Sequence, residues 1–328
     1  MLIAVHVVAA LVLLVLASDA FTNAVEWLGS LLGLTRNAMG SVVAAIGSSM
    51  PETMVAFIAL IVLRDPASQA VGIGAVIGAP FMLATAVFGL IGVTAIVRRR
   101  FRGDTLDASL PATAFGLGLF ALTFAVAIGA SFAPTAALRS VAVVIVLLAY
   151  ASFLWYQLRR RGSQSGEEPL PLRFAPRAKT PALGLVITQF AVAIVVTIGA
   201  SRWFVASVAD AASATHLSPL LVSLVLSPIA TEIPEAANVT IWMRRGLDEL
   251  AMGNVLGAML FQTSIASALA ILASPWRLDH DAYLAAILAG VAVLAVLLWS
   301  SIRRRVSAAA LAACGLLYGV YVAAVFIK

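Results

Sequence analysis

Ten apolar stretches, each about the length of a membrane-crossing helix, constrain this sequence more than any other feature. A helix needs about 20 predominantly apolar residues to cross the hydrocarbon core of a bilayer. The stretches lie at residues 2–18, 38–63, 68–97, 109–130, 136–158, 180–200, 216–242, 248–273, 282–302 and 305–327. The chain is therefore predicted to be an all-α membrane protein with ten transmembrane helices.

The composition excludes several classes of protein. Hydrophobic residues make up 62% of the chain and charged residues 11%, whereas soluble domains are about 45–50% apolar and about 25% charged. A soluble enzyme, a disordered chain and a nucleic-acid-binding protein do not fit these values. The expected surroundings are a lipid bilayer, with no nucleic-acid partner. The single cysteine excludes an intrachain disulfide.

The basic residues give an orientation. If the ten stretches alternate across the membrane, 16 of the 21 Lys and Arg residues fall in loops on one side. Cytoplasmic loops of membrane proteins carry such an excess of positive charge. We therefore expect both termini outside, in the plasma membrane of a prokaryote.

The two halves of the chain resemble each other at a nearly constant offset. With an offset of 183 positions, Glu52 aligns with Glu235, and each follows a proline. With an offset of 179 positions, Gly74 aligns with Gly253, and each begins a GxxxG motif. Because five helices are an odd number, the second copy enters the membrane upside down. Inverted repeats of this kind are typical of secondary transporters, with the ion site near the midplane. The GxxxG motifs predict close packing against the helices that carry the Pro-Glu pairs.

This repeat divides the chain into three parts. The first inverted repeat covers residues 1–158, a cytoplasmic linker covers 159–179, and the second repeat covers 180–328. The linker contains Gly, Ser, Glu and Pro, so it is predicted to be flexible. It is too short for a folded domain.

Three acidic residues fall inside predicted spans, namely Glu52, Glu232 and Glu235. A charged side chain at the centre of a spanning helix costs about 2.5–3.5 kcal/mol on insertion scales. No Lys or Arg is predicted at similar depth to neutralise these carboxylates. They must be protonated or must hold cations, so protons and cations compete for one site.

Other oxygen atoms are predicted beside the two Pro-Glu pairs. A proline inside a helix has no N–H for the carbonyl four residues earlier, and freed carbonyls in membranes line cavities. Ca²⁺ takes six to eight oxygen ligands. The candidates are the carbonyls of Gly47 and Ala230, the hydroxyls of Ser48, Ser49 and Thr231, and the side chain of Gln262.

With these motifs the sequence resembles the cation/calcium exchanger superfamily, which includes the sodium/calcium exchangers. Its members carry two inverted repeats, each with a Gly-Ser/Thr-Ser-x-Pro-Glu element and a later Gly-Asn-x-x-Gly-Ser-Asn element. Here the first element reads GSSMPE at 47–52 and ATEIPE at 230–235, and the second reads GAVIGAP at 74–80 and GNVLGAM at 253–259. The resemblance implies that Glu52 and Glu235 are the central cation ligands. It also implies that the first and sixth spans slide against the rest.

The sequence departs from the family pattern at five positions. Ala79 and Ala258 stand where the family has a serine, and Leu83 and Gln262 stand where it has Asn or Asp. Glu232 replaces the serine that precedes the hydrophobic residue and proline. Oxygen ligands have been lost and one carboxylate gained, which leaves the identity and number of the ions open.

The sequence predicts a secondary active cation antiporter that exchanges Ca²⁺ for Na⁺ or H⁺, with no cofactor besides the transported cations. Two alternatives stay open: a monovalent Na⁺/H⁺ or K⁺/H⁺ antiporter, and a non-transporting sensor or scaffold with the same fold. An enzyme is not expected, because no Ser/His/Asp, Cys/His or HExxH arrangement lies at membrane depth. The oligomeric state is open.

Overall fold

The computed structural model describes residues 2–32, 49–98, 105–159 and 169–326, and within these ranges every regular element is a helix and no strand is present. Eight helical stretches are long and apolar enough to cross a membrane, and two shorter apolar helices span Met50–Leu63 and Pro219–Ile229. The elements in chain order are α1 (Leu2–Leu31), α4 (Met50–Phe57), η2 (Ile58–Leu63), α5 (Pro66–Met82), η3 (Leu83–Val87), α6 (Phe88–Arg98), α7 (Leu110–Gly129), η4 (Ala130–Phe132), α8 (Ala136–Arg159), α9 (Leu183–Thr215), α10 (Pro219–Thr231), α11 (Ile233–Arg245), α12 (Asp248–Phe261), η5 (Gln262–Ala266), α13 (Ser267–Ala273), α14 (His280–Arg303) and α15 (Ala308–Phe326).

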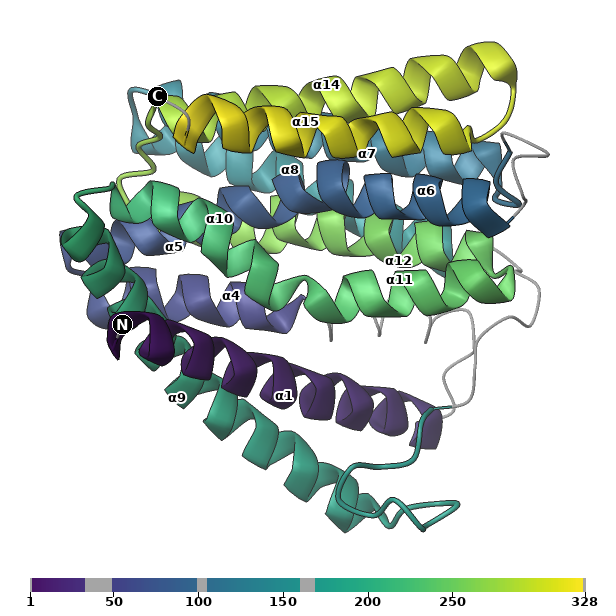
Figure 1. Ribbon diagram of the computed structural model, residues 1–328, viewed down its shortest axis with the longest axis horizontal. Coiled ribbons are helices and arrows are strands. Elements are labelled where there is room, and N and C mark those ends of the chain that lie inside the picture. The colour runs from purple at the N-terminus through teal and green to yellow at the C-terminus, as the bar shows by residue number, and fades with distance from the viewer. Residues whose placement is uncertain (1, 33–48, 99–104, 160–168, 327–328) are drawn as a thin grey trace.

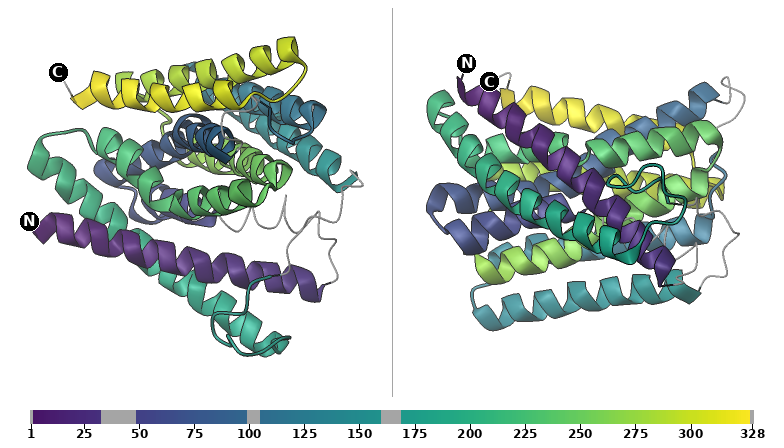
Figure 2. Two further views of the ribbon diagram at one scale, coloured as in Figure 1. Left: turned by 45° about the vertical axis from the view of Figure 1, so that its right-hand side comes forward. Right: turned by 90° about the horizontal axis from the view of Figure 1, so that it is seen from below.

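The helices form one bundle with both chain ends on the same side (Figures 1 and 2). Its interior consists of the stretches Pro66–Arg98 and Asp248–Ala273. In their 18-residue apolar segments, 78% and 83% of the residues are buried. In the corresponding segments of α1 and α9 only 28% of the residues are buried. These two helices lie together at one side of the bundle (Figure 1). Their exposed Val, Leu and Ile side chains suit contact with lipid.

Two helices are much longer than predicted. The sequence predicts spans at 2–18 and 180–200, whereas α1 ends at Leu31 and α9 continues to Thr215. The predicted spans end before Asp19 and Asp210, because acidic residues lower the local hydropathy. Both lie inside these helices. The segment 38–48 of the second predicted span lies outside the described residues.

Helix irregularities recur at corresponding positions of the two halves. Ser49 precedes α4 with φ −85° and ψ 6°, and Glu232 separates α10 from α11 with φ −89° and ψ −1°. These two residues are 183 positions apart. The π-helical segments η3 and η5 are related by the other offset, 179. In both halves a proline follows in the first turn of the new helix, where its missing N–H costs no hydrogen bond.

Glycines bring α5 into close contact with α10, as the first GxxxG motif predicts. A Cβ atom at Gly74 or Gly78 would collide with the backbone carbonyls of Leu220 and Leu224. The two helices therefore pack backbone to backbone, which brings the first half of the chain against the helix break of the second. No described atom lies within 4 Å of a Cβ built at Gly253, so close packing of the second motif stays a prediction.

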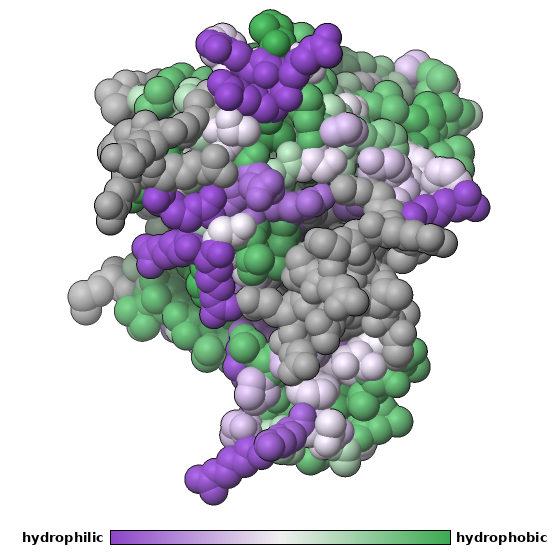
Figure 3. All heavy atoms as spheres, turned by 90° about the vertical axis from the view of Figure 1, so that its right-hand side faces the viewer, coloured by the Kyte–Doolittle hydropathy of each residue, from purple (hydrophilic) through white to green (hydrophobic). Residues whose placement is uncertain are grey.

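Basic side chains lie where α6, α8, α11 and α14 end, at the end of the bundle on the right of Figure 1. Figure 3 views this end, where hydrophilic residues gather. Arg98 at the end of α6 pairs through two nitrogens with the buried Asp248 at the start of α12, at 2.6 and 2.9 Å. The arrangement matches the predicted concentration of basic loops on one side.

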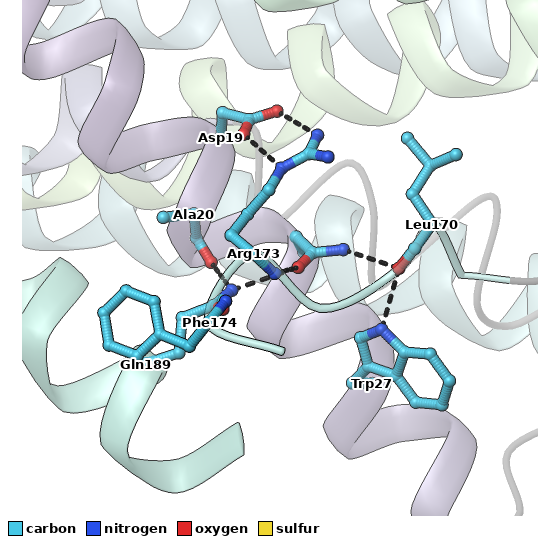
Figure 4. Close-up of polar contacts among 8 residues, drawn as sticks. Asp19, Ala20, Trp27, Leu170, Arg173, Phe174 and Gln189 are labelled. Atoms are coloured by element: carbon cyan, nitrogen blue, oxygen red, sulfur yellow. Dashed lines mark hydrogen bonds and ion pairs between the residues drawn. The ribbon is translucent and has the colours of Figure 1, made fainter. Parts of the chain in front are cut away.

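A segment of the predicted linker is held firmly against α1 (Figure 4). The carbonyl oxygen of Leu170 accepts hydrogen bonds from Asn23 Nδ2 at 3.0 Å and Trp27 Nε1 at 2.8 Å. Arg173 pairs with Asp19 through Nε at 2.7 Å and Nη2 at 2.9 Å. These hydrogen bonds raise the pKa of the Arg173 guanidinium.

The same segment also contacts α9 through the fully buried Gln189 (Figure 4). Its Oε1 accepts from the backbone N–H of Phe174 at 2.9 Å, and its Nε2 donates to Ala20 O at 2.8 Å and Asn23 Oδ1 at 3.0 Å. The prediction of a flexible linker is therefore wrong for Leu170–Phe174. This strap joins α1 to α9.

Replacing Asn23 by leucine is expected to lower the free energy of unfolding by about 1–3 kcal/mol, because buried hydrogen-bonding groups lose their partner. Asn23 serves Leu170, Arg173 and Gln189 at once. Asp19→Asn is the control and should cost less than about 1 kcal/mol, because the Asp19–Arg173 pair is exposed. Thermal unfolding in detergent measures both, and a larger loss for Asp19→Asn would contradict this account of the strap.

Candidate cation site at the two helix breaks

Two glutamates occupy the first turns of the helices that start at the breaks. Glu52 lies in the first turn of α4 and Glu235 in the first turn of α11. Their exposed fractions are 2% and 0%. A carboxylate is stabilised at a helix N-terminus by the unpaired N–H groups and the helix dipole. Each break thus orients one acidic side chain inside the bundle.

Glu232 brings a third carboxyl group to the same place. It lies between α10 and α11 and is fully buried. The carboxyl of Glu52 lies beside the Glu232 carboxyl and the Thr231 hydroxyl, and Glu232 is close enough to both Glu52 and Glu235 for their charges to interact. Because buried like charges repel, the three groups cannot all be ionised without a counter-charge.

Gln262 joins these carboxyls from the π-helical segment η5. Its Nε2 donates to Glu232 Oε1 at 2.7 Å, and its Oε1 has no hydrogen-bond partner among the described residues. The widened turn of a π-bulge often marks a functional position in a helix. Gln262 therefore orients Glu232 and leaves one amide oxygen for a further contact.

Two predicted hydroxyl ligands are also buried here. The Ser49 hydroxyl makes no hydrogen bond within the described part of the chain. Thr231 donates to Ser227 O at 2.9 Å and faces Glu52. Ala230 lies in the last turn of α10. The predicted ligands Gly47 and Ser48 lie outside the described residues.

The two halves differ in the polar groups that they supply. Leu83 begins η3 as Gln262 begins η5, and it is fully buried. Ala79 and Ala258 are also buried and offer no side-chain oxygen. Asn254 on α12 is an additional buried polar group, and its Nδ2 has no acceptor among the described residues. The second half therefore supplies most of the polar side chains.

The donor atoms are carboxyl, hydroxyl and amide oxygens. These are hard ligands, which Ca²⁺ and Na⁺ prefer and soft metals do not. Within the described ranges, no group of three or more His, Cys, Asp and Glu side chains has the separations of a preformed metal site. The sequence grouped Glu52, Glu232 and Glu235 by their depth. It gave no signal for the Gln262–Glu232 hydrogen bond, which joins residues 30 positions apart.

Comparison with known proteins identifies one family over nearly the whole chain. The sodium/calcium exchanger protein family matches residues 2–159 and 185–327. Inner membrane protein YrbG of Escherichia coli (strain K12) is 26% identical over 276 residues, which cover 83% of this chain and 80% of that protein.

Solved structures of exchangers share the fold. The H⁺/Ca²⁺ exchanger CAX superposes with a TM-score of 0.76 at 15% sequence identity, over 97% of this chain and 81% of CAX. The sodium-calcium exchanger NCX_Mj, soaked with Na⁺ and Sr²⁺, superposes with a TM-score of 0.61 at 17% identity, over 98% of both chains. The all-α fold of this chain is therefore exchanger-like.

Proposed function

The chain belongs to the sodium/calcium exchanger protein family, and from this premise we propose that it is a secondary active antiporter that exchanges Ca²⁺ for Na⁺ or H⁺ across a prokaryotic plasma membrane. The observation that carries the proposal is the cluster of three buried glutamates at the two helix breaks, Glu52, Glu232 and Glu235. Negative charge at this depth needs a neutralising partner. When protons and metal cations alternate as that partner, the site performs exchange.

We propose that the bundle is made of ten transmembrane helices in two inverted repeats, 1–158 and 180–328. The matching helix breaks at Ser49 and Glu232, and the matching π-helical segments, support this division. An inverted pair of half-sites supplies one Pro-Glu element from each half. Glu52 and Glu235 then flank the cation, with Ser49, Thr231 and Gln262 as further ligands.

Alternating access is proposed to involve α1 and α9 together. These helices are the least buried of the long spans that approach the helix breaks, and the strap Leu170–Phe174 connects them. A pair of helices that is joined in this way can slide against the interior as one body. The movement exposes the carboxyls first to one side of the membrane and then to the other.

One observation favours the second candidate, a monovalent Na⁺/H⁺ or K⁺/H⁺ antiporter. Buried apolar side chains at Leu83, Ala79 and Ala258 leave fewer oxygen ligands, and Ca²⁺ takes six to eight. The Ca²⁺ proposal is preferred because three carboxyls at one place supply the charge that a divalent ion neutralises best.

Radioactive ion flux into proteoliposomes tests the proposal. With Na⁺ or H⁺ loaded inside, the purified protein should take up Ca²⁺ against its gradient, and uptake should stop when the driving gradient is dissipated. Uptake of Na⁺ or K⁺ driven by H⁺, without Ca²⁺ uptake, would support the monovalent candidate. Absence of any cation flux would support the non-transporting scaffold.

A further inference from the structure

The two peripheral helices each carry a buried serine at corresponding positions. Ser18 lies in α1 and Ser201 in α9, 183 positions apart. Their exposed fractions are 2% and 0%, and the alanine that precedes each one is buried as well. Both serines therefore lie on the sides of α1 and α9 that face the protein rather than the lipid.

Neither serine hydroxyl makes a hydrogen bond within the described part of the chain. A helical Ser or Thr side chain commonly donates to the carbonyl four residues earlier. Thr197 and Thr188 of α9 follow this habit, with distances of 2.7 Å to Ala193 O and 2.8 Å to Gly184 O. The hydroxyls of Ser18 and Ser201 do not make this bond, and burial without a partner is unfavourable for a polar group.

A small, partly open hollow lies beside Ser18 and reaches the helix break of the first half. Its volume is about 10 Å³, room for about one water molecule. Ser18 and Thr197 supply its polar lining, and the other lining residues are Phe21, Met50, Pro51, Met54 and Ile194. Pro51 directly precedes Glu52. The hollow therefore lies between the Ser18 hydroxyl and the start of α4, one residue from the first central glutamate.

We propose that Ser18 and Ser201 are the cation ligands of the two access routes, one in each repeat. Each hydroxyl coordinates the partly dehydrated cation while it passes between the solution and the central glutamates. Ser201 occupies the position of the second repeat that corresponds to Ser18, 183 residues later. This inference rests on the proposed function and assigns to α1 and α9 a direct contact with the ion.

Transport kinetics give the first test. Ser18→Ala and Ser201→Ala should each raise the KM for Ca²⁺ uptake about threefold to tenfold, the effect of one lost hydrogen-bond-strength contact. Thermal stability should not fall, because alanine removes a polar group that has no partner among the described residues. Ser213→Ala is the matched control, because that hydroxyl is exposed and bonds to Ala209 O. An unchanged KM in both variants would overturn the proposal.

The single cysteine of the chain makes a second test direct. Cys314 is buried, so a Cys314→Ala background allows Ser18→Cys and Ser201→Cys variants to be labelled selectively with a cationic methanethiosulfonate reagent. Both variants should react, each preferentially from one side of the membrane, and Ca²⁺ should slow the reaction at least about threefold.

The two proposals fail in distinguishable ways. If the wild-type protein exchanges cations but neither cysteine variant reacts, or Ca²⁺ protects neither, the access-route ligands are overturned and the exchanger function stands. If the wild-type protein moves no cation, the proposed function fails. Labelling that is insensitive to every cation would then overturn the access-route ligands as well.

Discussion

Replacing Glu52 or Glu235 by glutamine is expected to lower Ca²⁺ uptake into proteoliposomes by about 100-fold or more. Each variant keeps the shape of the side chain and removes one negative charge from a buried position. A divalent cation held by the remaining carboxyls loses an attraction that is strong at low dielectric. Loss of a residue that only supports a metal ligand commonly costs about 10- to 100-fold, and loss of a ligand itself should cost at least as much.

The folded protein should tolerate both changes, because a neutral amide is easier to bury in a membrane than a carboxylate. Thermal unfolding of the variants therefore separates lost transport from lost structure. Glu249→Gln is the matched control: this glutamate lies in the first turn of α12 and is exposed. Uptake by the Glu52→Gln, Glu235→Gln double variant at the rate of Glu249→Gln would rule out the paired glutamates as the transport site.

The apolar pattern of the sequence predicts the helices well, because length and hydropathy alone decide whether a segment can cross a bilayer. The ends of α1 and α9 could not be predicted in the same way. The predicted ends followed local hydropathy, whereas Asp19 lies inside α1 and pairs with Arg173, 154 positions away. A partner that is distant in the sequence cannot be recognised from the residues around Asp19.

In the candidate site, too, the residues could be predicted from the sequence but their tertiary contacts could not. Glu52 and Glu235 were predicted as a pair because each follows a proline and both recur at the repeat offset. Gln262 was predicted to be a neutral polar ligand, but its hydrogen bond to Glu232 depends on how η5 packs beside the second break. Such contacts arise when helices distant in sequence are brought together, so only the folded bundle reveals them.

The third carboxyl group leads to the second large effect, on the pH dependence of Ca²⁺ affinity. A bound Ca²⁺ balances two of the charges of Glu52, Glu232 and Glu235, so one of these glutamates is expected to keep its proton. Glu232→Gln imitates that protonated form, and its amide oxygen can still accept the hydrogen bond from Gln262. At about pH 6 the variant and the wild type should therefore bind Ca²⁺ with similar affinity.

At about pH 9 this last proton is expected to leave as well. The two proteins should then differ by about tenfold or more, because one linked proton changes an affinity by up to tenfold per pH unit. As the pH rises, fewer protons compete for the wild-type carboxyls and its Ca²⁺ affinity increases. Glu232→Gln lacks one of these groups, so its Ca²⁺ affinity should stop increasing at a lower pH than that of the wild type.

Stabilisation of the purified proteins by Ca²⁺ in thermal unfolding measures the affinities by mass action. Coinciding curves at every pH would place Glu232 outside the cation site, and a wild-type affinity that stays flat from pH 5 to 9 would contradict shared binding of protons and cations by the glutamates.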